Sequence, residues 1–147
     1  MKNLLFLLLV GLQFGFAQSI DYNTKKGYVA EGYDVVAYFE NKAIEGNKTY
    51  TVTYDGVKYK FVSQEHLDAF QQHPEKYIPQ YGGYCAYAMG ESGKKVNINP
   101  ETFEIRDGKL YLFYNAWGTN TLELWLKDDV KGLQKKADQN WEAVKHK

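Results

Sequence analysis

The chain contains a single cysteine, Cys85, so no disulfide can form within it and its fold must be held together by packing. Several motifs of common chemistries are also missing from the sequence. It has no phosphate-binding glycine loop, no GxSxG nucleophile motif, no HExxH zinc helix and no CxxC redox pair. These absences disfavour triad hydrolysis, zinc peptidase chemistry and thioredoxin-type exchange.

An excess of charge of one sign is missing as well. The 147 residues include 18 Lys and Arg and 18 Asp and Glu, and the two signs are interspersed along the chain. Such a balance creates no extended field that would attract a polyanion. We therefore expect no nucleic-acid partner.

Long hydrophobic runs are confined to the first residues. The run from Leu4 to Leu12 is much shorter than the ~20 residues of a membrane-spanning helix. It follows Lys2 and precedes small residues ending at Ala17, which is the pattern of a cleavable signal peptide. We predict a signal peptide over residues 1–17, no membrane span, and a periplasmic or secreted protein whose single domain covers residues 18–147.

Two hairpins are predicted from runs of strand-forming residues that flank an Asp-Gly pair, because both positions of a tight hairpin turn favour positive φ. The paired runs are 49–54 with 57–62 and 102–106 with 109–114. The last run has little polar face, which predicts a central strand. The stretch DVVAYF at 34–39 predicts a further short buried strand.

Helices are predicted after the first hairpin and at the C-terminus. Ser63 is a typical N-cap for a helix ending near His73, and a helical turn follows from Pro74. From Leu122 onward the apolar residues recur at steps of three and four, so an amphipathic helical region is expected, with a bend near Gly132. The fold class is α+β: a small antiparallel sheet of hairpins with helices packed on it.

Candidate metal ligands are few. Cys85 lies in the stretch YGGYCAYAM at 81–89, and it can be read as a metal ligand, a reactive thiol or a small buried residue. With Cys85, the residues His66, Asp34 and Met89 form a candidate donor set, and its soft donors suit copper or zinc. Each has a structural alternative: a surface or capping role for His66, a turn for Asp34, and core packing for Met89.

Three segments together resemble the YHS-domain family in its exported bacterial form. They are GYDVVAYF (32–39), YKFVSQEHLDAF (59–70) and HPEKYIPQYGGYCAYAM (73–89), and the resemblance extends through DGKLYLFYN and KADQNW. It implies a small module related to treble-clef-like, TRASH-type metal-binding domains.

The chain departs from the metal-binding relatives at their cysteines. Where such a relative reads D-P-V-C, this chain reads DVVA at 34–37, and where one reads F-C-S-x-x-C, it reads FVSQEH at 61–66. A four-cysteine site is therefore excluded, and a different site that uses Cys85 with His66 or Asp34 remains open.

The resulting prediction is a non-enzymatic exported protein that binds a metal ion, copper or zinc, or a small ligand near Cys85. Tyr59, Tyr84 and Tyr87 are candidate ligand-binding residues. Two alternatives are a thiol-based redox protein or enzyme that uses Cys85 as its nucleophile, and a structural interaction module without a ligand.

Overall fold

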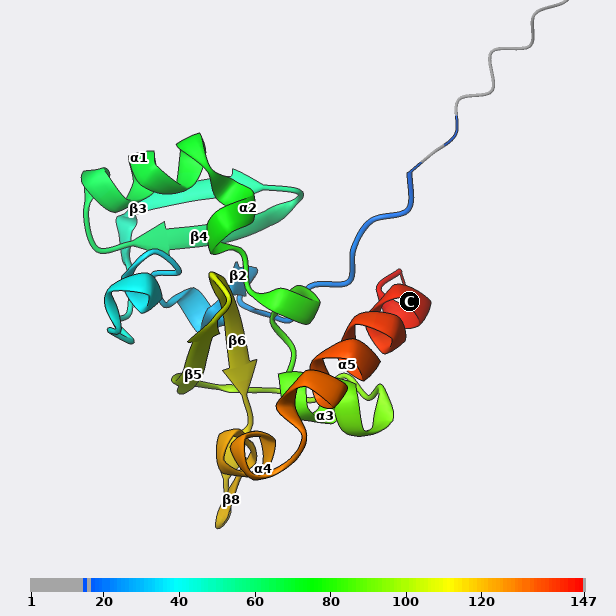
Figure 1. Ribbon diagram of the computed structural model, residues 1–147. Coiled ribbons are helices and arrows are strands. Elements are labelled where there is room, and N and C mark those ends of the chain that lie inside the picture. Colours follow the sequence, from blue (N-terminus) through cyan, green and yellow to red (C-terminus); the bar gives the residue numbers. More distant parts are fainter. Residues whose placement is uncertain (1–14, 16, 147) are drawn as a thin grey trace, which may run out of the picture.

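The computed structural model describes residue 15 and residues 17–146 (Figure 1). The elements in chain order are β1 (Thr24–Lys25), β2 (Tyr28–Val29), η1 (Ala30–Gly32), η2 (Ala37–Glu40), β3 (Asn47–Tyr54), β4 (Val57–Phe61), α1 (Gln64–Gln72), α2 (Pro74–Tyr77), η3 (Gln80–Gly83), α3 (Ala86–Ser92), β5 (Asn99–Arg106), β6 (Lys109–Phe113), β7 (Asn115–Ala116), β8 (Thr119–Asn120), α4 (Thr121–Lys127) and α5 (Val130–Val144). This mixture of helices and small hairpin sheets confirms the predicted α+β class.

The predicted signal peptide falls almost wholly outside the described residues. Within the described part of the chain, no helix is both long and apolar enough to cross a membrane.

The first predicted hairpin, β3 with β4, is confirmed. Its turn is Asp55-Gly56, with positive φ at both residues. On the other edge of β4, β2 pairs in parallel and β1 pairs with β2, which gives the strand order β1-β2-β4-β3. Helix α1 lies over this sheet (Figure 1), and the ring of Phe70 packs against the rings of Tyr59 and Phe61 from β4.

The second predicted hairpin, β5 with β6, also forms, but the predicted central position of β6 was wrong. Among the described residues, β6 pairs with β5 alone in a two-stranded sheet. Leu110 and Leu112 enter one buried cluster, while Tyr111 and Phe113 enter a second cluster on the opposite face. The strand lacks a polar face because both of its faces are covered.

The C-terminal amphipathic region consists of two helices, α4 and α5. The helical conformation is interrupted at Asp128 and Asp129, just before the bend expected near Gly132. Asp129 caps α5, because its carboxylate accepts a hydrogen bond from the N–H of Gly132 at 3.1 Å. Leu133 and Ala137 of α5 are buried in the second cluster with Ala86 and Met89 of α3. Figure 1 shows the two helices side by side.

The strand predicted over 34–39 was wrong: this segment is a turn followed by η2. The Oδ1 of Asp34 accepts hydrogen bonds from the backbone N–H groups of Val36 at 2.8 Å and Ala37 at 3.0 Å. A side-chain acceptor that serves residues two and three positions ahead favours a turn over an extended strand. The turn brings Glu40 back toward the start of α1.

Candidate functional site

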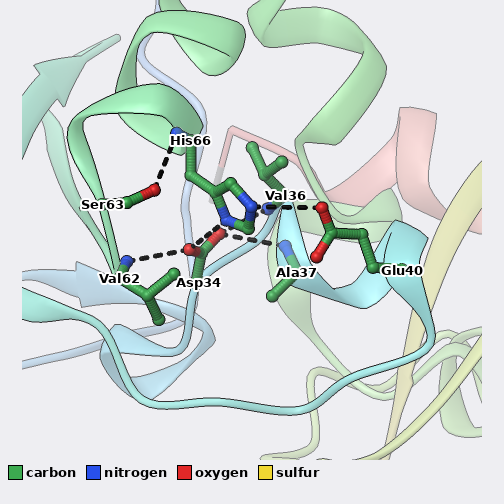
Figure 2. Close-up of polar contacts among 7 residues, drawn as sticks. All are labelled: Asp34, Val36, Ala37, Glu40, Val62, Ser63 and His66. Carbon is green, nitrogen blue, oxygen red and sulfur yellow. Dashed lines mark hydrogen bonds and ion pairs between the residues drawn. The ribbon is translucent and has the colours of Figure 1, made fainter.

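Asp34 is a fully buried carboxylate whose acceptor positions are all used. In addition to the two bonds at Oδ1, its Oδ2 accepts from the N–H of Val62 at 2.9 Å and from Nδ1 of His66 at 2.7 Å (Figure 2). A carboxylate offers about four lone-pair positions, so Asp34 retains none for a metal ion. It holds the imidazole of His66 and ties the first turn of α1 to the segment that precedes η2.

His66 connects this buried carboxylate to the surface. The Ser63 side chain caps α1 by accepting the N–H of His66 at 3.2 Å, which fixes the position of the imidazole in the first turn. Because an ionised carboxylate only accepts, Nδ1 donates to Asp34 and Nε2 faces outward. The Oε1 of Glu40 lies 3.2 Å from Nε2, and the Glu40 side chain is 53% exposed (Figure 2). We call Asp34, His66 and Glu40 the His66 site.

The pKa of His66 is raised above its usual 6.5. Burial of the ring by itself would lower this pKa, but the hydrogen bond and negative charge of Asp34, together with the charge of Glu40, outweigh it. Protonated His66 donates to a carboxylate from each ring nitrogen. In the neutral ring, the bond to Asp34 retains the proton on Nδ1, and Nε2 becomes a free electron-pair donor.

The outer half of the His66 site has the donor types and spacing of a metal site. Two donors about 2.0–2.2 Å from one zinc ion, at a tetrahedral angle, lie about 3.4 Å apart, and Nε2 of His66 and Oε1 of Glu40 are 3.2 Å apart. The inner half has the arrangement in which a ligating histidine donates its second N–H to a carboxylate. Across the described residues, no three His, Cys, Asp or Glu side chains are grouped to hold one ion, so this site supplies two protein ligands.

Cys85 does not join His66 and Asp34. Its side chain is fully buried, and its Sγ lies 3.3 Å from Oγ1 of Thr121. The Thr121 hydroxyl donates its one proton to the carbonyl of Tyr114 at 2.6 Å, so the thiol is the donor to Thr121. This enclosed position matches the packing interpretation of Cys85.

The other predicted site residues lie apart from the His66 site. Met89 is fully buried in the second cluster, on the far side of β6 from the cluster that contains Cys85. Tyr59 is buried against Phe70, and Tyr84 and Tyr87 are half-buried. The Tyr84 hydroxyl donates to Asp21 at 3.4 Å. The structure therefore brings together only Asp34 and His66 of the predicted set, and the role of each residue in binding stays a prediction.

Glu40 is the residue of the His66 site that the sequence interpretation missed. Reading 34–39 as a strand places Glu40 at the end of an extended segment, far from Asp34. Asn41, at φ 61, ends η2 in the left-handed conformation that asparagine adopts more readily than most residues. An Asx turn at Asp34 followed by Asn41 is the local signal that could have indicated a return of the chain.

The arrangement is that of a small α+β module in which a hairpin, one helix and a preceding turn present a buried Asp–His pair to the surface. Residues 35–81 match the family described as the YHS domain. Over this segment the chain is similar to a YHS domain, which agrees with the resemblance found in the sequence. The matched segment includes His66 and Glu40, and it ends before Cys85. Searches of curated proteins and of solved structures gave no match.

Proposed function

We propose that this protein is a non-enzymatic binding module that takes one zinc or copper(II) ion at Nε2 of His66 and the carboxylate of Glu40. The observation that carries the proposal is the continuous Asp34–His66–Glu40 arrangement. The match to a YHS domain supports a metal-binding module in general terms. From the sequence of residues 1–17 we also propose that the protein acts in the periplasm or outside the cell.

The donor chemistry of the His66 site suits these ions. Imidazole is a common ligand of zinc and copper, and a carboxylate oxygen completes a mixed nitrogen and oxygen donor pair. Asp34 keeps the proton on Nδ1 and sets the orientation of the ring, so it positions the ligand without binding the ion. Two protein ligands leave further coordination positions to water or to a ligand from outside the chain. Such a site favours reversible capture over permanent structural binding.

This proposal relocates the predicted metal site. The sequence interpretation places it near Cys85, whereas the proposed ligands are His66 and Glu40, with Cys85 enclosed beside Thr121. The choice rests on accessibility, because the imidazole at the His66 site is in reach of solvent and the thiol is fully buried.

Zinc titration of the metal-free full-length protein by isothermal calorimetry tests the proposal. His66→Asn places an amide N–H where Nδ1 was, so the bond to Asp34 can persist while the Nε2 ligand is lost. Loss of an outer-shell partner alone lowers metal affinity about 10–100-fold, so His66→Asn and Glu40→Gln are each expected to lower zinc affinity more than about tenfold.

Two exposed residues at the ends of α1 provide matched controls. His73→Asn and Glu65→Gln are expected to bind zinc as the unmodified protein does. Equal zinc affinity in His66→Asn and the unmodified protein would contradict the proposal, as would loss of binding in Cys85→Ala alone.

The zinc affinity should also depend on pH in a defined direction. A proton on Nε2 competes with the ion, and the raised pKa of His66 extends this competition above pH 6.5. Affinity is therefore expected to rise with pH until His66 is neutral and then to level off. Calorimetry at a series of pH values measures this rise, and a flat profile in the same range would count against ligation by His66.

A further inference from the structure

A second polar pocket lies apart from the His66 site, between the first hairpin and the segments before it. Its volume is about 450 Å³, and four lysines line it: Lys25, Lys26, Lys48 and Lys60. Tyr33 also lines this pocket, whereas its neighbour Asp34 points into the His66 site. The two sites are thus separate environments on either side of one short segment.

The pocket carries an excess of positive charge although the whole chain is balanced. Glu31 and Glu45 are its two acidic residues. Glu31 pairs with Lys25 at 3.6 Å, and Glu45 pairs with Lys60 at 3.4 Å. Among the described residues, Lys26 and Lys48 have no acidic partner. Two positive charges of the pocket lining are therefore left without a neutralising carboxylate.

Lys60 of the pocket and the neighbouring Lys58 both lie against the ring of Tyr28. The ammonium groups of Lys58 and Lys60 lie 4.4 and 4.9 Å from the ring centroid of Tyr28. Each lysine side chain passes close to a glycine that leaves room for it. A Cβ on Gly27 would lie 2.9 Å from Cε of Lys58, and a Cβ on Gly32 would overlap the Lys60 side chain.

Lys60 is largely enclosed by these contacts with Tyr28 and Gly32. Its side chain is only 11% exposed, which is unusual for a lysine, so its ammonium group is positioned inside the pocket before any ligand arrives.

We propose that this pocket binds a small dianion of the phosphate class, with Lys26 and Lys48 as its principal donors and Lys60 as the fixed charge behind them. The two unneutralised lysines match two negative charges. A phosphate group also offers several oxygen acceptors to ammonium groups that approach from different segments. Free inorganic phosphate and the phosphate monoester of a larger molecule or lipid share this chemistry.

The test is a titration of the metal-free full-length protein at low salt, where screening is weakest. Binding is monitored through the changes in backbone amide chemical shifts in NMR spectra. The probes are inorganic phosphate, glycerol phosphate, and phosphatidylcholine vesicles with or without phosphatidic acid. Since a hydrogen bond to a charged group contributes about tenfold in affinity, the Lys26→Gln/Lys48→Gln double variant is expected to bind at least about tenfold more weakly.

A second double variant, Lys127→Gln/Lys136→Gln, removes the same charge from exposed positions outside the pocket and is expected to retain full binding. His66→Asn should leave phosphate binding unchanged, which separates this inference from the proposed metal site. Binding of the soluble probes assigns a free phosphate as ligand, and binding of phosphatidic acid vesicles alone assigns a lipid headgroup. Failure of every probe to bind, or equal loss in the two double variants, overturns the proposal.

Discussion

Tyr59 and Tyr38 are both buried in the first cluster but differ in what their hydroxyl groups contact. The Tyr38 hydroxyl donates to the carbonyl of Pro100 at 2.6 Å, whereas the Tyr59 hydroxyl has no hydrogen-bond partner within the described structure. Burial raises the pKa of both phenols, so both remain neutral hydroxyls at ordinary pH. Removing the hydroxyl from each tyrosine in turn therefore compares the loss of a hydrogen-bonded hydroxyl with the loss of an unbonded one.

We predict opposite effects of removing these two hydroxyls. Tyr59→Phe is expected to raise the free energy of unfolding by about 1 kcal/mol, because a buried polar group without a partner is removed. Tyr38→Phe is expected to lower it by about 1 kcal/mol, because the hydrogen bond is lost and the carbonyl of Pro100 is left unpaired. Urea denaturation measures both, and a destabilised Tyr59→Phe would indicate an unseen partner for that hydroxyl.

At the residue scale, the sequence indicates which side chains can bind a metal ion, but it does not indicate which of them lie close together in the fold. His66 and Asp34 could be selected because imidazole and carboxylate are metal donors, but no local pattern links residues 32 positions apart. Their contact depends on the Ser63 cap, which orients the first turn of α1. Cys85 drew attention because it is the one thiol, and its burial follows from packing that no short motif specifies.

At the element scale, the same turn occurs four times in the part of the chain that the structure describes. Each hairpin turn has a glycine at its second position and a non-glycine residue with φ near +50° at its first, and these first residues are Lys26, Asp55, Asp107 and Trp117. A bulky residue is unusual in this conformation, whereas aspartate tolerates it. The indole of Trp117 is also 97% exposed, so it adds almost nothing to the core.

Replacement of Trp117 by aspartate is therefore expected to leave the free energy of unfolding unchanged or to raise it by up to about 1 kcal/mol, because the turn is relaxed and no buried surface is lost. Thermal and urea denaturation measure the change. Trp125, which is fully buried, serves as the contrast. Trp125→Ala should cost about 3–5 kcal/mol. A clear loss of stability in Trp117→Asp would mean that the indole supports the fold.

The two hairpins with Asp-Gly turns could be predicted because these pairs act locally through backbone conformation, whereas the hairpins that turn at Lys26-Gly27 and Trp117-Gly118 were not predicted. The segment 34–39 could not, because its run of valine, alanine and aromatic residues has strand propensity while one carboxylate directs the backbone into a turn. Helical periodicity indicated the C-terminal region, but the break between α4 and α5 depends on the cap at Asp129, whose carboxylate binds the N–H of Gly132 and leaves no room for a Cβ there.

At the scale of the whole molecule, β6 is the element on which both clusters meet. A strand with apolar residues on both faces is typical of the centre of a sheet, yet β6 pairs with one strand. One of its faces is buried in the cluster that includes residues of β2 and β4, and the other is buried against helices α3, α4 and α5. The sequence could indicate that both faces of β6 are buried. Which elements cover them is decided by long-range packing that periodicity does not encode.

Complete burial gives the lone thiol a use as a reporter of breathing motions. An alkylating reagent can reach Cys85 only while the surrounding structure is transiently open, so the labelling rate of the native protein divided by that of the unfolded chain gives the fraction of time spent open. We expect this ratio to be well below one in ten, as read by mass spectrometry. Equal rates would show that Cys85 is accessible in the native molecule.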